Sequence, residues 1–259
     1  MGAKIHWFND LNCDYLILYF HGGGFGLPPN EGHPKFLIEC QEKLSQKGKR
    51  VAIALLEYSL TPESQYPTQP QQALLALQQV LKKGFDPSNI VLGGDSAGGN
   101  LTLAVLSLLS HPAPPFPTVK LTAPLRGALL ISPWVSFSTQ SESFQSCAHR
   151  DYVNKLQVFE WADAYCPSPI RNEYSEPARA GSDWWKGLPV QEVLVLAGGM
   201  EVFHDDVKTL GTNLTAAGVK LKVIECENHT HIECILDAVA GLEPGQMAYA
   251  IWDWLDITF

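Results

Sequence analysis

The chain has 259 residues, with 27 acidic and 18 basic side chains, which give a formal net charge of −9 at pH 7. This acidic balance, without a basic run, argues against binding to nucleic acid or to an anionic membrane surface. The amino terminus has no apolar signal core and no stretch is long enough to span a bilayer, so a cytoplasmic protein is expected. The six cysteines show no C-x-x-C pair and no metal-ligand spacing, so we expect reduced thiols and no metal site.

Short apolar runs predict seven strands, near residues 4–8, 15–20, 51–56, 90–94, 128–132, 192–197 and 220–225. Helical patterns separate most of them, at residues 34–47, 68–83, 99–110, 205–217 and 245–256. This alternation predicts an α/β fold, with a mostly parallel sheet of about seven strands flanked by helices. We expect the first strand to be an antiparallel edge, and residues 1–259 to form a single domain.

The pentapeptide Gly94–Gly98 (GDSAG) follows the predicted strand 90–94 and precedes a predicted helix. A G-x-S-x-G sequence in this context is typical of the sharp strand-to-helix turn that exposes a nucleophilic serine. Glycine is needed on both flanks because a Cβ there would collide with the neighbouring strand and helix. The sequence therefore predicts that Ser96 is a catalytic nucleophile.

A second glycine-rich turn, His21–Gly24 (HGGG), follows the predicted strand 15–20. Acyl transfer develops negative charge on the carbonyl oxygen, and fixed N–H donors must already point at that position. We expect the amides of Gly22, Gly23 and Ala97 to form this oxyanion hole. His21 is expected to hold the turn by hydrogen bonds.

Several motifs in order resemble those of the hormone-sensitive-lipase-like branch of the α/β-hydrolase superfamily. They are HGGGF at 21–25, EYSLTPE at 57–63, which resembles "YRLAPE", GDSAGGN at 94–100 and ISPW at 131–134. The resemblance runs from about Tyr15 to the C-terminus. It implies an α/β-hydrolase fold and a carboxylesterase or deacylase that needs no metal or organic cofactor.

The resemblance also implies positions for the triad acid and base, which follow the serine in that order. The family's "D-P-L-x-D" pattern aligns with residues 201–205, which puts Glu201 in the place of the acid, with Asp205 as the alternative. Either carboxylate type can orient an imidazole and stabilise its charged form. The family's "G-x-x-H" position maps onto His231, with His229 as the alternative base.

Two departures from the family bear on the substrate. HGGG begins at residue 21, where relatives have several tens of residues before it, so part of the cap and one edge strand are expected to be missing. The site would then be open, or closed by a partner subunit. The aromatic-rich insertion at residues 135–188 is expected to form a reduced helical cap. Phe25 and Trp134 are expected near the serine as substrate contacts, which favours short acyl chains.

The sequence thus predicts a serine carboxylesterase or deacetylase that acts on a small-molecule ester or acylated metabolite through a Ser96–His231–Glu201 triad and an acyl-enzyme. The alternative is a tailoring hydrolase or cyclase of secondary metabolism that uses the same triad for thioester release or lactonisation. Receptors of this family lose the catalytic histidine, and His231 argues against that class. The apolar C-terminal segment 245–255 fits either a homodimer contact or packing on the sheet.

Overall fold

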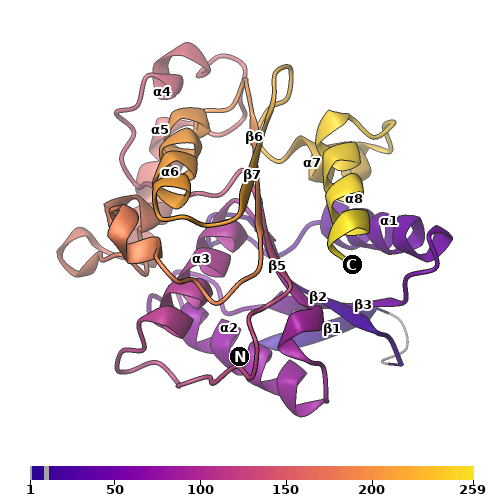
Figure 1. Cartoon of the computed structure of the whole chain (residues 1–259). Coiled ribbons are helices and arrows are strands. Elements are labelled where there is room, and N and C mark those ends of the chain that lie inside the picture. Colours follow the sequence, from indigo (N-terminus) through magenta and orange to yellow (C-terminus); the bar gives the residue numbers. More distant parts are fainter. Residues whose placement is uncertain (1, 9–11) are drawn as a thin grey trace.

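In the computed structural model, which describes residues 2–8 and 12–259, seven strands form one sheet in the order β1-β3-β2-β4-β5-β6-β7 (Figure 1). The strands are β1 (Lys4–Phe8), β2 (Tyr15–Phe20), β3 (Val51–Glu57), β4 (Ile90–Asp95), β5 (Gly127–Ile131), β6 (Val193–Gly198) and β7 (Leu221–Cys226). Strand β1 runs antiparallel to β3, and every other neighbouring pair is parallel. The predicted seven-stranded sheet and its antiparallel edge are therefore confirmed.

Helices cover both faces of the sheet (Figure 1). One face carries α1 (Gly32–Gln46), α7 (Glu233–Ala240) and α8 (Gln246–Thr258), and the other carries α2 (Thr68–Lys82), α3 (Ala97–Ser110) and α6 (His204–Ala216). Each face has its own apolar core, because successive side chains of a strand point to opposite sides. In β2, Leu16 and Leu18 belong to one core, and Ile17 belongs to the other. Parallel strands buried on both faces read as continuous apolar runs, which is why the sequence predicted them well.

The long connection from β5 to β6 forms a layer beside α6 (Figure 1). It contains α4 (Ser143–Ser146), α5 (Lys155–Tyr165) and the short 3₁₀ helices η2 (Ser168–Ile170), η3 (Pro177–Arg179) and η4 (Ser182–Trp185); a further one, η1 (Pro87–Asn89), precedes β4. We call residues 135–188 the cap insertion. The buried Asn100 side chain in α3 donates to the carbonyls of Trp134 and Ser175, at 2.8 and 3.0 Å. The second of these bonds links the cap insertion to the helix α3.

The C-terminal helix α8 packs on the sheet through the buried side chains of Met247, Ile251 and Leu255. Its apolar residues therefore contribute to the core on the α1 face. Of the helices in the described ranges, none combines the length and apolar character needed to cross a lipid bilayer.

Candidate active site

Ser96 lies in the turn between β4 and α3 with φ 52° and ψ −117°, a conformation that non-glycine residues rarely adopt. Its amide donates to the carbonyl of Ile131 and its carbonyl accepts from the amide of Trp134, both at 2.9 Å. A Cβ on Gly98 would strike the Phe20 carbonyl, and one on Gly94 would strike Gly98. The surrounding strands thus leave space for the strained turn only with glycine at both positions, as the motif predicted.

Glu201 and His231 follow β6 and β7, so they reach the same edge of the sheet as Ser96. The Glu201 Oε2 lies 3.4 Å from the Nδ1 of His231, and both side chains are almost fully buried. Ser96 and His231 line one cavity of about 160 Å³. The structure therefore brings the three predicted triad residues to one place.

The two alternative residues have other partners. Asp205, in the first turn of α6, accepts from the amide of Ser143 at 2.8 Å. The Nδ1 of His229 faces Glu233 at 3.5 Å. Neither contact is with the Glu201–His231 pair.

The environment of His231 favours its charged form. Burial alone would lower the pKa of this imidazole, but contact with the Glu201 carboxylate and the charges of Asp151 and Asp95 outweigh burial and raise it. A carboxylate beside imidazole also stabilises the imidazolium that forms when the ring accepts a proton. The site can therefore hold a proton on His231 during a reaction.

The glycine turn is fixed through His21 and Tyr58. The Nδ1 of His21 lies 2.7 Å from the carbonyl of Gly22, the imidazole stacks on Tyr58 at 4.1 Å, and the Tyr58 hydroxyl donates to the His21 carbonyl at 2.6 Å. Burial is the main reason that the pKa of His21 falls to about 4, so the ring is neutral and donates its proton. The predicted holding role of His21 is confirmed.

Beneath the glycine turn lies a buried ionic network centred on Asp95. Its Oδ1 accepts from the Tyr19 hydroxyl and the Gly22 amide, each at 3.0 Å, and the carboxylate lies 3.3 Å from the Nε2 of His33. Burial would raise the pKa of Asp95, but His33 and the Tyr19 hydroxyl lower it overall. Burial would likewise lower the pKa of His33, and Asp95 raises it overall. A lowered carboxyl pKa and a raised imidazole pKa both favour the charged forms, so Asp95 and His33 are described as an ion pair.

This network changes the expectation for the oxyanion donors. The Gly22 amide, one of the expected donors, points at Asp95 instead. Gly23 and Gly24 line the cavity that contains Ser96, and among the described residues their amides donate to no protein atom. Ala97, the first residue of α3, has its amide at the positive end of the helix.

Phe25 and Trp134, the expected substrate contacts, are fully buried and do not line this cavity. Phe25 stacks on Tyr165 at 3.7 Å, and Trp134 packs against Phe137 at 4.7 Å. The cavity walls combine the glycine turn, the cap insertion and α7; their residues are Gly23, Gly24, Leu27, Pro28, Asn30, His33, Ser96, Tyr152, Val153, Trp161, His231, Ile232 and Leu236.

Sequence reasoning missed Ser132, which has φ 44°. Its hydroxyl accepts from the amide of Ile232 at 3.3 Å and so supports the loop that carries His231. Tyr152 was predicted only as one of several aromatic residues of the insertion, and its ring lies 5.8 Å from that of His231. The position of Ser132 inside the "SPW" motif was the one available signal.

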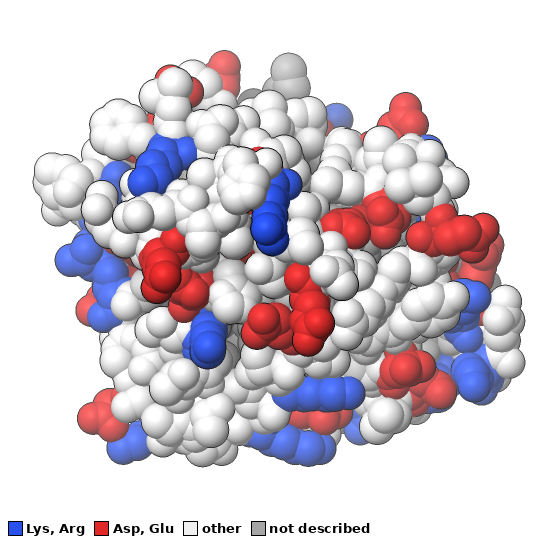
Figure 2. Space-filling view, turned by 90° about the horizontal axis from the view of Figure 1, so that it is seen from above, with Lys and Arg blue, Asp and Glu red and all other residues white. Residues whose placement is uncertain are grey.

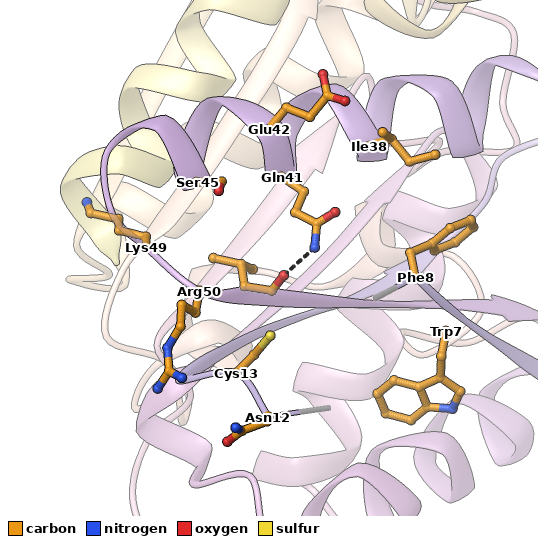
Figure 3. A pocket seen from close by; sticks show the side chains of 11 residues that line it. Trp7, Phe8, Asn12, Cys13, Ile38, Gln41, Glu42, Ser45, Lys49 and Arg50 are labelled. Atoms are coloured by element: carbon orange, nitrogen blue, oxygen red, sulfur yellow. Dashed lines mark hydrogen bonds between the residues drawn. The ribbon is translucent and has the colours of Figure 1, made fainter. Parts of the chain in front are cut away.

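A larger hollow of about 750 Å³ lies at the opposite edge of the sheet, between α1 and the starts of β2 and β3 (Figure 3). The Gln41 side chain donates to the carbonyl of Val51 at 2.7 Å, and a dashed line in Figure 3 marks this hydrogen bond. Because Val51 begins β3 and Ser96 follows the end of β4, this hollow is separate from the candidate active site.

Figure 2 shows acidic and basic side chains scattered among uncharged residues on the face that it presents. Within residues 2–8 and 12–259, no group of three or more His, Cys, Asp or Glu side chains is arranged to hold a metal ion.

A family model described as the alpha/beta hydrolase fold matches residues 17–234. An acetyl-hydrolase of Streptomyces hygroscopicus is 27% identical over 218 residues, covering 83% of this chain and 67% of the relative. An esterase of Acinetobacter venetianus is 25% identical over 213 residues, covering 80% of this chain and 63% of the relative. The chain thus spans about two thirds of the length of these curated relatives.

Solved structures agree with this assignment. The crystal structure of an esterase from the bacterial hormone-sensitive lipase family superposes with a TM-score of 0.82 and 28% identity, covering 100% of this chain and 83% of that one. The family model, this likeness and the order of the motifs lead to the same conclusion: the chain belongs to the α/β-hydrolase family, in its hormone-sensitive-lipase-like branch.

Proposed function

We propose that the protein is a serine carboxylesterase or deacetylase that hydrolyses short-chain esters through an acyl-enzyme. The observation that carries this proposal is that Ser96 and His231 line one cavity walled by the glycine turn, with the Glu201 carboxylate 3.4 Å from His231. The relatives' names, acetyl-hydrolase and esterase, support the same reaction class.

In this mechanism the Ser96 hydroxyl attacks the acyl carbon while the Nε2 of His231 takes its proton. The C–O bond to the alcohol breaks as His231 returns that proton to the leaving oxygen. Water then loses a proton to the same His231 and attacks the acyl carbon. The bond from that carbon to the Ser96 oxygen breaks as His231 returns the proton to this oxygen, which releases the acid and restores the enzyme. Glu201 holds the imidazole through Nδ1 and stabilises its charged form.

We propose that the backbone amides of Gly23, Gly24 and Ala97 donate hydrogen bonds to the oxyanion. Gly22 then has a supporting role, because its amide already donates to Asp95. Fixed donors of this kind are each worth about 10²- to 10³-fold in rate.

The substrate is proposed to carry a short acyl group. Pockets for drug-sized ligands have volumes of roughly 300–1,000 Å³, and the cavity at Ser96 has about 160 Å³. Apolar side chains from the cap insertion and α7, such as Trp161 and Leu236, form part of its wall. We therefore propose Tyr152 and Trp161, rather than Phe25 and Trp134, as substrate contacts within a cap formed by residues 135–188.

The test is initial-rate hydrolysis of p-nitrophenyl acetate, butyrate and octanoate by the wild type and Ser96→Ala. We expect acetate or butyrate to be preferred, and the variant to lose about 10⁴-fold or more in kcat. Equal rates for the two proteins would contradict the proposal, and fastest turnover of octanoate would contradict the short acyl group.

The tailoring alternative gives a different pattern in the same assay. A wild type that hydrolyses none of the three esters, yet is labelled at Ser96 by a fluorophosphonate, would favour thioester release or lactonisation on a specialised substrate.

A further inference from the structure

Asp151, in the cap insertion between α4 and α5, contacts the loop that carries the triad acid. Its Oδ2 accepts from the amide of Val202 at 2.8 Å, and Val202 is the neighbour of Glu201. Its Oδ1 accepts from the amide of Val153 at 3.2 Å. One carboxylate therefore ties the cap insertion to the acid loop, across 51 positions of sequence.

The two residues after Asp151 reach the active-site cavity. The Tyr152 ring lies 5.8 Å from the His231 ring, at an angle of 48°. Tyr152 and Val153 both line the cavity that contains Ser96. Three consecutive residues of the cap insertion thus touch the acid loop, the base and the space for the substrate.

The charge of Asp151 also reaches His231. The acidic groups that act on this imidazole come from three elements: Glu201 on the acid loop, Asp151 on the cap insertion and Asp95 at the end of β4. The Tyr152 phenol packs on the same ring. Asp151 differs from Glu201 because only its charge acts on the His231 imidazole, whereas the Glu201 carboxylate also contacts that ring.

We propose that Asp151 is a positioning residue. Its carboxylate holds the loop that carries Glu201, so that Glu201 stays in contact with the His231 ring. Its negative charge also stabilises the imidazolium form of His231. This inference rests on the proposed function, since it assumes that His231 is the base. It gives one short segment of the cap insertion, residues 151–153, a role in supporting the Glu201–His231 pair.

The experiment compares Asp151→Asn with Asp163→Asn, both within the cap insertion. Asp163 is an exposed residue of α5, so its variant makes the same chemical change away from the acid loop. In Asp151→Asn the amide replaces one accepting oxygen and removes the charge. Three quantities are measured: kcat and KM on p-nitrophenyl acetate as a function of pH, the titration of His231 by NMR, and the thermal unfolding midpoint.

For Asp151→Asn we expect kcat to fall by about 10- to 100-fold, because small displacements of a catalytic group cost this much. KM should change little. The loss of a negative charge lowers the pKa of His231, so its NMR titration and the acidic limb of kcat/KM should both move to lower pH. Asp163→Asn should match the wild type in all three measurements.

The proposal is overturned if Asp151→Asn and Asp163→Asn show the same His231 titration, or if the loss of kcat is explained by unfolding at the assay temperature. The NMR titration does not need turnover. A wild type that hydrolyses no ester, with a His231 titration that still shifts in Asp151→Asn, would contradict the proposed function and show that Asp151 acts on His231 independently of ester hydrolysis.

Discussion

At the scale of single residues, the two carboxylates near the start of α6 differ in what they contact. Glu201 is fully buried beside His231, and Asp205 is bound to the amide of Ser143. We predict that Glu201→Gln lowers kcat by roughly 10³- to 10⁴-fold, because an amide cannot stabilise the imidazolium or fix the same tautomer. Asp205→Asn should stay within about 10-fold of the wild type, since its contact is structural. Steady-state kinetics of the two variants on one ester decide the point; the reverse order would make Asp205 the acid.

The pH profile gives a second prediction at this scale. His231 must be neutral to take a proton from Ser96, and its pKa is raised in the folded protein. The acidic limb of kcat/KM should therefore lie above the ordinary histidine pKa of about 6.5. In Glu201→Gln the largest favourable contact is lost and burial remains, so the limb should move to lower pH. A limb that stays in place in this variant would mean that Glu201 does not act on His231.

At this scale, the sequence indicated where the candidate residues lie, and their catalytic roles stay predictions. Ser96 could be located because its turn needs glycine at two fixed positions. Glu201 and His231 could be located through the resemblance to the family, since each aligns with a family motif that follows a strand. The sequence did not predict the partner of the Gly22 amide. That partner, Asp95, lies 73 positions away, and a motif carries no information about which acceptor an amide will meet.

At the scale of elements, the junction of β4 and α3 is the most constrained part of the fold. We predict that Gly98→Ala destabilises the protein by about 3 kcal/mol or more, since the added Cβ meets the Phe20 carbonyl in a packed strand. Gly181→Ala is the matched control, because Gly181 has φ −76° and open space around its Cβ position. Urea unfolding of both variants measures the difference. Equal midpoints would show that the strand-to-helix turn at Ser96, which we call the elbow, can relax.

The helix α5 shows what the sequence pattern could not supply. Val158, Ala162 and Tyr165 are buried along one side, but Leu156 and Phe159 are exposed on the other. With apolar residues all around, its periodicity does not single out a buried face. The sequence therefore predicted a helical cap insertion at residues 135–188 but not the bounds of the helix α5 within it. Tyr152, Phe25 and Trp134 lie in loops, where no periodicity indicates a buried side, so the sequence could not show that Tyr152 lines the cavity while Phe25 and Trp134 are buried away from it.

At the scale of the whole molecule, the parallel sheet assembles the site from distant parts of the sequence. The turn after β2, the elbow after β4, and the loops after β6 and β7 share one edge because these strands run in the same direction. The network of Asp95, His33 and Tyr19 joins that edge to the core on the α1 face. Because this network contains an imidazole and a carboxylate that titrate, its contribution to the free energy of unfolding should depend on pH.

We predict that His33→Gln destabilises the protein by about 3 kcal/mol near pH 6, because it leaves the Asp95 carboxylate buried without its counter-ion. The pKa of His33 is raised on folding, so the stability that its charge provides is fully present below the unfolded pKa of about 6.5. That stability is lost as the pH rises through the folded value. The difference between wild type and variant should consequently shrink from pH 6 to pH 9. Other titrating groups occur in both proteins and largely cancel in the comparison. Urea unfolding of both proteins at several pH values measures this difference, and a constant gap would mean that His33 and Asp95 form a neutral hydrogen bond.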